Sequence, residues 1–325
     1  MRLHPFFLYC LFFTLATCSS SQRHAPDQRA EPSQLTISSD AREIIVLNNN
    51  RPILSYNITA NLPAGLPNHY RRSGYFHPVY SPSGQIITDG FPVGYAHQHG
   101  IFTAWTKTKF RGREVDFWNT QKGLATVRHV KTSRVDTAGK DEKIDFETTL
   151  NHYALIENDS LAVLQETLEV TVHDREDVYV WDLTSRQQNT TQDTLFLLQH
   201  LYGGLGVRGS KHWNPKDSVN FTGPAQFLTS DGFARDSANH TKPIWTAMYG
   251  SLPNGKAGLA VIPHPDNLSW PQPVRVHPNL PYFSVSPVVF APAFIAPGEV
   301  VVARYRFVTF DGLPQAGLLS ELAWE

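Results

Sequence analysis

The stretch Ile144-Asp-Phe-Glu-Thr-Thr-Leu150 decides the fold. Ile144, Phe146, Thr148 and Leu150 stand at every second position, and the residues between them are Asp, Glu and Thr. Side chains of a β-strand point alternately to its two faces, so this pattern predicts a strand with one buried and one exposed face. Runs of the same kind extend from it in both directions along the chain.

Strand-like runs follow one another with turn residues between them. Residues 43–47 and 53–56, joined by Asn48-Asn-Asn, predict a β-hairpin. Further strands are expected at 100–105, 124–130, 161–172, 178–184, 194–202, 244–250, 258–262 and 300–310. One short helix is expected near the C-terminus, around 318–323, and the Pro- and Gly-rich residues 263–297 are expected to form long loops over the sheet. So many strands without interleaved helices predict an all-β fold, a large antiparallel β-sandwich in a single domain.

The charge balance and the positions of the cysteines bear on nucleic-acid binding and on disulfide bonds. The chain has 28 basic and 29 acidic residues, with a formal net charge of -1. Because no basic stripe stands out, we expect no nucleic-acid partner. The two cysteines, Cys10 and Cys18, both lie near the N-terminus, so no disulfide is expected within the folded body.

The N-terminal residues are typical of an export signal. Arg2 precedes an apolar run from Phe6 to Ala16, which is too short to span a bilayer. Leu15-Ala-Thr-Cys18 resembles a bacterial lipobox, in which the cysteine is lipidated. We therefore predict a signal peptide at 1–17, lipidation of Cys18, a flexible tether at 18–34 and the sandwich at 35–325. The expected location is the periplasm or outer membrane, with a lipid anchor as the only membrane contact; the alternative is an ordinary secretory signal and a secreted protein.

Two histidines stand out in Gly94-Tyr-Ala-His97-Gln-His99-Gly, at the mouth of a predicted strand. If this segment is extended, His97 and His99 project to the same face. Two imidazoles can bind a metal, act as an acid and a base, or hold a polar ligand. A metal site needs a third ligand, and the chain offers several candidates without indicating which one converges: His77, His129, His200, His264 and Asp116. A metal at His97 and His99 stays one possibility.

Four further clusters combine polar and aromatic side chains. They are His77 within Tyr75–Gly84; Arg113, Asp116 and Trp118; His200, Tyr202 and Arg208; and His264 with Asn267. Each also has a purely structural interpretation. A His-Pro pair can end a strand, Gly203-Gly204 can form a bend, and residues 111–116 can form a solvated hairpin rim.

Taken together, these clusters favour a carbohydrate site. Aromatic rings stack on sugar rings, while Arg, His and Asp hydrogen-bond to hydroxyls. We predict a catalytic set of His97, His99, Asp116 and His200. The substrate-binding set is expected to be His77, Arg113, Trp118, Tyr202, Arg208, His264 and Asn267. The reaction could resemble that of an epimerase, a lyase or a hydrolase; the alternative is a sugar-binding lipoprotein without catalysis. There is no Gly-X-Ser-X-Gly motif for a nucleophilic hydrolase.

The same clusters carry a family resemblance. The motifs, in order, are Tyr75-Phe-His-Pro-Val-Tyr80, His97-Gln-His-Gly-Ile-Phe-Thr-Ala-Trp105, Val115-Asp-Phe-Trp118, Tyr202-Gly-Gly-Leu-Gly-Val-Arg208, Ile262-Pro-His264 and Arg304-Tyr-Arg306. This order resembles the bacterial family labelled methane oxygenase PmoA, whose label implies a metal-dependent oxidoreductase. Many members have Asp-His-Pro-His-His-Arg-Gly where this chain has Gly94-Tyr-Ala-His97-Gln-His99-Gly. The strand content and the segment up to Arg208 are also similar to β-supersandwich proteins of the galactose-mutarotase type, which implies sugar binding across one sheet.

Overall fold

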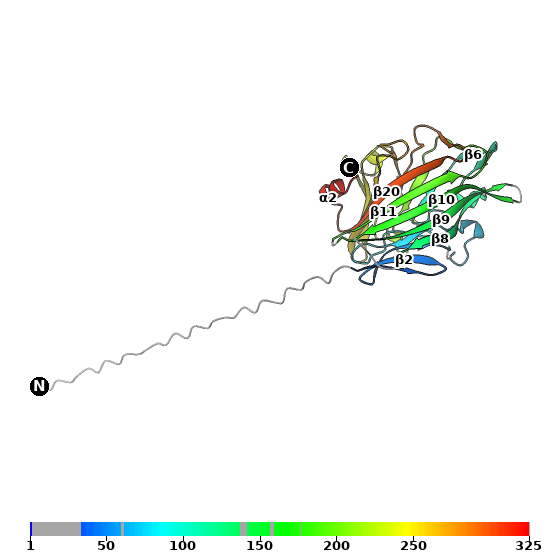
Figure 1. Ribbon diagram of the computed structural model, residues 1–325. Helices are drawn as coiled ribbons and strands as arrows, with labels where there is room; N and C mark the ends of the chain where they lie inside the picture. The colour runs from blue at the N-terminus through cyan, green and yellow to red at the C-terminus, as the bar shows by residue number, and fades with distance from the viewer. Residues whose placement is uncertain (2–33, 60–61, 137–141, 157–158, 176, 325) are drawn as a thin grey trace. The chain divides into compact units, whose positions relative to one another are not determined.

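Two eight-stranded antiparallel sheets form the body of the protein in the computed structural model (Figure 1). The structure describes Met1 and residues 34–59, 62–136, 142–156, 159–175 and 177–324. Almost all of the predicted signal peptide and tether, with Cys18, lies outside the described residues. The residues from Ser33 to Glu325 form one compact unit.

The first sheet contains strands from both halves of the chain. Its order is β1 (Leu35–Ser39), β2 (Glu43–Asn48), β3 (Arg51–Asn57), β4 (Tyr75–Val79), β5 (Ile101–Ala104), β13 (Gly204–Arg208), β18 (Tyr282–Val285) and β17 (Val274–Val276). The predicted hairpin is confirmed: Asn48 pairs with Arg51 across Asn49 and Asn50. Both turn residues have positive φ angles, 48° and 62°, as a two-residue hairpin turn requires.

The second sheet holds the longest strands, and several of them run side by side in Figure 1. Its order is β14 (Gln226–Thr229), β15 (Thr246–Leu252), β16 (Gly255–Pro263), β20 (Val300–Asp311), β11 (Tyr179–Asn189), β10 (Asp159–His173), β9 (Lys143–Ile156) and β8 (Ala125–Val135). A small third sheet contains β19 (Ala293–Ile295), β12 (Leu195–Leu197), β6 (Thr108–Phe110) and β7 (Arg113–Val115).

The helical segments are short. The α-helices are α1 (Arg235–Ala238) and α2 (Ala316–Glu321), and the 3-10 turns are η1 (Asn68–Tyr70), η2 (Thr120–Lys122) and η3 (Lys211–Trp213). The expected C-terminal helix is therefore confirmed. Leu319 of α2 belongs to one buried cluster with Ile262 and Val308 of the second sheet and with Trp245, which precedes β15. None of the helices in the described ranges is long and apolar enough to cross a membrane.

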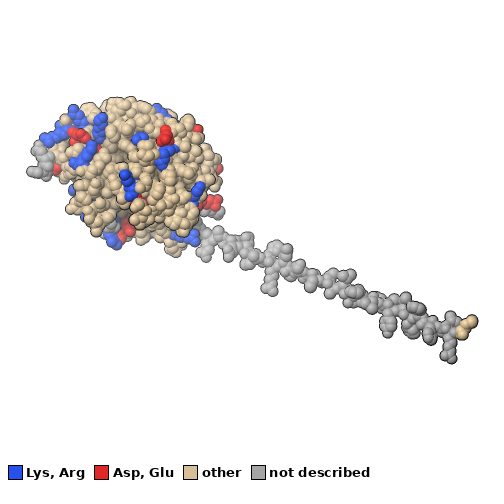
Figure 2. Space-filling view, turned by 180° about the vertical axis from the view of Figure 1, so that it is seen from behind, with Lys and Arg blue, Asp and Glu red and all other residues tan. Residues whose placement is uncertain are grey.

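The core lies between the two large sheets. Phe76 of β4 contacts Trp181 of β11 with ring centroids 5.2 Å apart, and Trp181 stacks on Phe307 of β20 at 3.9 Å. Such contacts between inward-facing side chains define a sandwich. The all-β sandwich predicted from the alternating pattern is therefore confirmed. On the face drawn in Figure 2, basic and acidic side chains are scattered with wide uncharged areas between them.

Three local expectations were wrong. The Pro- and Gly-rich residues 263–297 contain three short strands, β17, β18 and β19, in addition to loops. Of the strand expected at 194–202, only Leu195–Leu197 is extended and paired. The segment with His97 and His99 is a loop before β5, in which the backbone N–H of Gln98 donates to Tyr95 O at 2.9 Å. Because of this turn the segment is not extended. The expectation that His97 and His99 project to the same face of a strand is therefore wrong.

Candidate functional site

The outer face of the first sheet carries polar and aromatic side chains. Arg208 pairs with Tyr282, and Gly206 pairs with Phe102. Residues paired across antiparallel strands share a face, as do residues two apart along a strand. Thr103 points the other way, because its hydroxyl donates to Glu166 of the second sheet at 2.6 Å. Phe102, Arg208 and Tyr282 therefore face away from the sandwich core.

Strand β4 and the loops before β5, after β7 and before β13 bring further side chains to this face. We call the group the outer-face cluster: His77, Asp89, Tyr95, His97, Gln98, His99, Trp118, Tyr202, Arg208 and Tyr282.

Arg208 is the most confined charge of the outer-face cluster. Its side chain is 0% exposed. Nη1 donates to Gln98 Oε1 at 2.8 Å, and the guanidinium carbon lies 5.9 Å from the Tyr95 ring centroid. Nε and Nη2 have no hydrogen-bond partner among the residues that the structure describes. Burial lowers the pKa of Arg208 to about 10, against the opposing charge of Asp89. Unpaired buried donors are costly, so a ligand oxygen at these nitrogens would stabilise the group.

Charges of opposite sign act on the pKa of His97. Burial lowers the pKa of His97 to about 4, with Asp116 opposing this shift and Arg208 reinforcing it. The imidazole is therefore neutral at pH 7, and its unprotonated ring nitrogen can accept a hydrogen bond. Asp116 Oδ1 accepts from the backbone N–H groups of Trp118 and Asn119 at 3.1 and 2.8 Å, and Oδ2 lies 2.9 Å from Lys122 Nζ. Asp116 thus shapes the loop that presents Trp118.

His99 occupies a different environment from His97. Its ring lies among Tyr75, Phe91 and Phe102, with centroids 5.2, 4.9 and 6.3 Å away. Nδ1–H donates to Gly90 O at 3.0 Å. Burial, reinforced by the charge of Arg72, lowers the pKa of His99 well below its usual value. Within the described part of the chain, no group of three His, Cys, Asp or Glu side chains is placed to hold a metal ion.

Three aromatic rings gather beside Arg208. Trp118 lies 6.2 Å from Tyr202 and 6.4 Å from Tyr282, and the two tyrosines are 5.9 Å apart. Gly206 permits this grouping, because a Cβ atom there would lie 2.9 Å from both Trp118 and Tyr282. Trp118 and Tyr282 are buried, whereas Tyr202 is partly exposed.

Pockets open at the other end of the outer-face cluster. His77 and Asp89 line two of them, of about 410 and 350 Å³. His77 Nδ1 lies 2.9 Å from Thr88 Oγ1, and burial lowers the pKa of His77 to about 4. Burial raises the pKa of Asp89, although Arg208 opposes this shift. Asp89 therefore loses its proton at a higher pH than an ordinary carboxyl group does.

The remaining predicted residues lie in several places. His200 adjoins the cluster: its ring is 6.1 Å from Tyr202, and its Nδ1 accepts from the Tyr202 backbone N–H at 3.1 Å. Arg113 is exposed on β7, beside the Arg111-Gly112 turn. His264 packs on Trp324 at 4.8 Å. Asn267 Nδ2 donates to Arg304 O at 2.8 Å, so Asn267 secures a loop on the second sheet.

Sequence reasoning did not select Asp89, Gln98, Tyr95 or Tyr282. Asp89 precedes a glycine in Thr88-Asp-Gly90, which is an ordinary turn sequence and carries no chemical signal. Tyr282 lies in the region expected to form loops. The pairing of β18 with β13 brings Tyr282 beside Arg208, and no local pattern reports that pairing.

Structural comparisons found distant neighbours. The glycoside hydrolase family 36 alpha-galactosidase AgaA from Geobacillus stearothermophilus matches with 12% identity and a TM-score of 0.39, over 85% of this chain and 40% of that one. A variant of that enzyme in complex with raffinose matches with 13% identity and a TM-score of 0.32, over 86% and 40%. Slr1438 from Synechocystis sp. PCC 6803 matches with 8% identity and a TM-score of 0.25, over 87% and 97%. The chain thus spans about 40% of the length of the alpha-galactosidase.

Sequence comparison corrects the family expectation. No curated protein matches the chain in sequence. The expected membership of the methane oxygenase PmoA family is wrong, because the family profile that matches is a different one, over residues 43–323. The motifs that suggested PmoA are therefore not diagnostic of it, and the oxidoreductase alternative loses its basis. The chain belongs to the DUF6807 family, a family of unknown function.

Proposed function

We propose that the protein binds a carbohydrate at the outer-face cluster. The observation that supports this proposal most directly is the grouping of Trp118, Tyr202 and Tyr282 beside the buried guanidinium of Arg208. Aromatic rings pack against the C–H face of a sugar, and a guanidinium donates directed hydrogen bonds to hydroxyl or carboxylate oxygens. His97 would add a neutral imidazole that accepts a hydrogen bond, and Asp89 a carboxyl group beside His77 at the adjoining pockets.

Binding of sugars by purified protein tests the proposal. We expect saturable binding from a panel of monosaccharides and oligosaccharides in calorimetry. Tyr202→Ala should weaken the affinity about tenfold, or about 1.4 kcal/mol, because the most exposed ring of the three is lost. Tyr249→Ala is the matched control, since Tyr249 is also partly buried but lies on β15 of the second sheet. Equal affinities of Tyr202→Ala and the wild type, or no binding of any sugar, would refute the proposal.

His97→Gln distinguishes a catalyst from a binding protein. If the cluster transforms its sugar by proton transfer, His97→Gln should lose turnover, followed by NMR of the sugar, and retain most of its affinity. If the wild type binds a sugar and leaves it unchanged in the same experiment, the protein is a sugar-binding module.

We also propose that the chain is exported and attached to a membrane through a lipid on Cys18, with residues 18–34 as a tether. The support for this proposal is the sequence alone: a short apolar run and Leu15-Ala-Thr-Cys18 followed by Ser19-Ser-Ser. Such an anchor would hold the sugar-binding face outside the cytoplasm, where extracellular glycans are found.

A further inference from the structure

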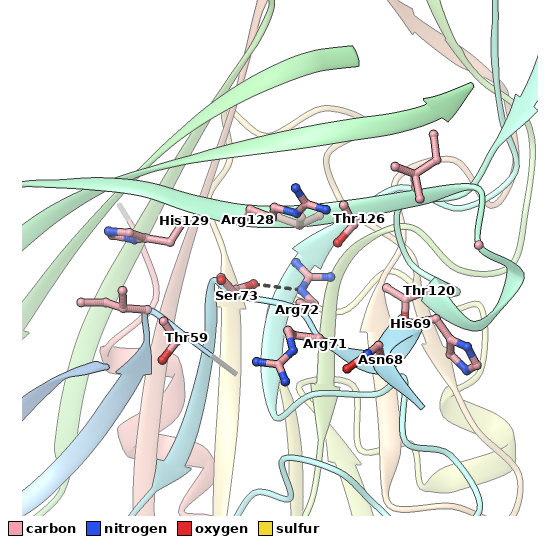
Figure 3. Close-up of a pocket in the computed structure, with 15 residues that line it drawn as sticks. Thr59, Asn68, His69, Arg71, Arg72, Ser73, Thr120, Thr126, Arg128 and His129 are labelled. Atoms are coloured by element: carbon pink, nitrogen blue, oxygen red, sulfur yellow. Dashed lines mark hydrogen bonds between the residues drawn. The ribbon is translucent and has the colours of Figure 1, made fainter. Parts of the chain in front are cut away.

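A separate pocket of about 760 Å³ lies beside β8, the edge strand of the second sheet. Figure 3 shows Thr126, Arg128 and His129 of β8 above it, and Arg71, Arg72 and Ser73 opposite them. Thr120 of η2 and His69 of η1 close one end (Figure 3). None of the outer-face cluster residues lines this pocket.

The lining of this pocket is basic. It contains Arg71, Arg72 and Arg128 together with His69 and His129, and no Asp or Glu occurs among its described lining residues. Arg71 and Arg128 are exposed, so their guanidinium groups are accessible from solvent. Arg72 is only 1% exposed and adds a buried positive charge behind them.

Two buried polar atoms of the lining lack partners. Arg72 Nη2 donates to Thr103 O at 2.8 Å and Nε donates to Ser73 O at 3.2 Å, but Nη1 has no hydrogen-bond partner in the described structure. Thr120 Oγ1 is also buried without a partner there. Buried polar groups of native proteins are nearly always hydrogen-bonded, so both atoms indicate a missing acceptor.

The carboxylate that acts most strongly on Arg72 does not supply the missing acceptor. Glu166 attracts Arg72 electrostatically. Its oxygens already accept hydrogen bonds from Thr103, His152 and Gln187 at 2.6, 2.7 and 3.0 Å, and also from Ser185. Glu166 therefore balances the charge of Arg72 from inside the sandwich but supplies no acceptor to Nη1. With no Asp or Glu among the described lining residues, the exposed Arg71 and Arg128 leave the mouth of the pocket positively charged.

We propose that this pocket binds a small organic anion through its carboxylate, phosphate or sulfate group. Arg71 and Arg128 would donate hydrogen bonds to the anionic oxygens at the mouth, since guanidinium groups match such oxygens in geometry and charge. Arg72 would stabilise the charge from behind, and the Thr120 hydroxyl would donate to a ligand oxygen. The volume lies in the range of ordinary small-molecule sites, roughly 300–1,000 Å³. No Phe, Tyr or Trp occurs among the described lining residues, so the pocket does not offer a neutral sugar a stacking face.

Calorimetry at low salt tests the proposal with four probes: inorganic phosphate, sulfate, D-glucuronate and D-glucose. We expect at least one anion to bind saturably, and the tightest of the three to identify the preferred group. The double variant Arg71→Gln with Arg128→Gln should bind that anion at least tenfold more weakly, and more weakly than either single variant. Both side chains are exposed, so the variant should remain folded.

Two controls separate this pocket from other sites. Arg51→Gln changes an exposed arginine at the opposite end of β3 from the pocket and should leave anion affinity unchanged. Tyr202→Ala should also leave it unchanged, so the result does not depend on sugar binding at the outer-face cluster. The proposal is overturned if none of the three anions binds, if the double variant binds as the wild type does, or if the double variant weakens the binding of glucose as much as that of the anion.

Discussion

At the scale of single residues, His77 and His97 link folding to pH. Burial lowers the pKa of each to about 4 in the folded protein, whereas a histidine in an unfolded chain has a pKa near ~6.5. Between these values the unfolded chain binds protons that the folded protein does not bind. The free energy of unfolding is therefore unaffected by these two histidines above pH ~6.5. It decreases as the pH falls toward ~4, by up to about 1.4 kcal/mol per pH unit for each histidine.

The variant His97→Gln tests this linkage at one position. Its free energy of unfolding, measured with urea, should fall less steeply with acidification than that of the wild type between pH ~6.5 and ~4. Above this range the two slopes should be equal, which separates titration from any general loss of packing. Equal slopes in the acid range would mean that His97 takes up its proton in the folded state.

The sequence predicted the backbone conformation of some site residues but not the environment of their side chains. The glycines after Tyr202 were expected to permit a bend or a close approach, and Gly203 and Gly204 indeed have positive φ angles, 144° and 83°. The separate environments of His97 and His99 were not predictable, because the loop conformation depends on contacts with β4 and β13. Asp89 was missed because its raised pKa comes from burial, which a turn sequence does not report.

At the scale of elements, β10 carries a buried carboxylate into the sandwich. Glu166 is 0% exposed and joins β5, β9 and β11 through Thr103, His152 and Ser185. Burial opposes its charged form, but the hydrogen bond and charge of His152, with the hydroxyls of Ser185 and Thr103, hold the pKa of Glu166 below its usual value. The network therefore fixes how the two sheets are positioned against each other.

Glu166→Ala should destabilise the protein by about 3–5 kcal/mol, because it leaves the buried Arg72 charge and several donors without their partner. Urea unfolding at pH 7 measures this loss. Glu169→Ala on the same strand is the control: Glu169 is partly exposed and lies 3.5 Å from Arg134, so its loss should cost no more than about 1 kcal/mol. A loss for Glu166→Ala as small as that of the control would contradict a role for this network in sheet packing.

Element length decided which strands could be predicted. β9 and β10 have 14 and 15 residues, and their alternating patterns identified them. β17 and β18 have only 3 and 4 residues and lie among prolines, so periodicity carried little information about them. Because these strands were not predicted, two residues of the candidate site were missed. β18 supplies Tyr282, and β17 supplies Arg275, whose guanidinium carbon lies 5.5 Å from the Tyr202 ring centroid.

At the scale of the whole molecule, strand pairing assembles the site from distant segments. β13 pairs with β5 and β18, which lie far from it in the sequence. This pairing brings Arg208 beside Gln98 and Tyr282, and it leaves His264 and Asn267 on the second sheet. Alternation predicts that strands exist, but it does not predict which strands are neighbours. The sandwich was therefore predictable, whereas the membership of the outer-face cluster was not.

The attachment of the whole chain to a membrane depends, in our proposal, on Cys18. Full-length protein expressed in a bacterium with radiolabelled palmitate should carry the label and sediment with membranes, because acyl chains supply the membrane affinity. Cys18→Ser should lose the label, and Cys10→Ser is the matched control that should keep it, since Cys10 lies within the predicted signal peptide. An unlabelled wild-type protein found in the medium would establish the ordinary secretory signal instead. Sugar binding by the same Cys18→Ser protein should equal that of the wild type, because the outer-face cluster contains no residue from the N-terminal segment.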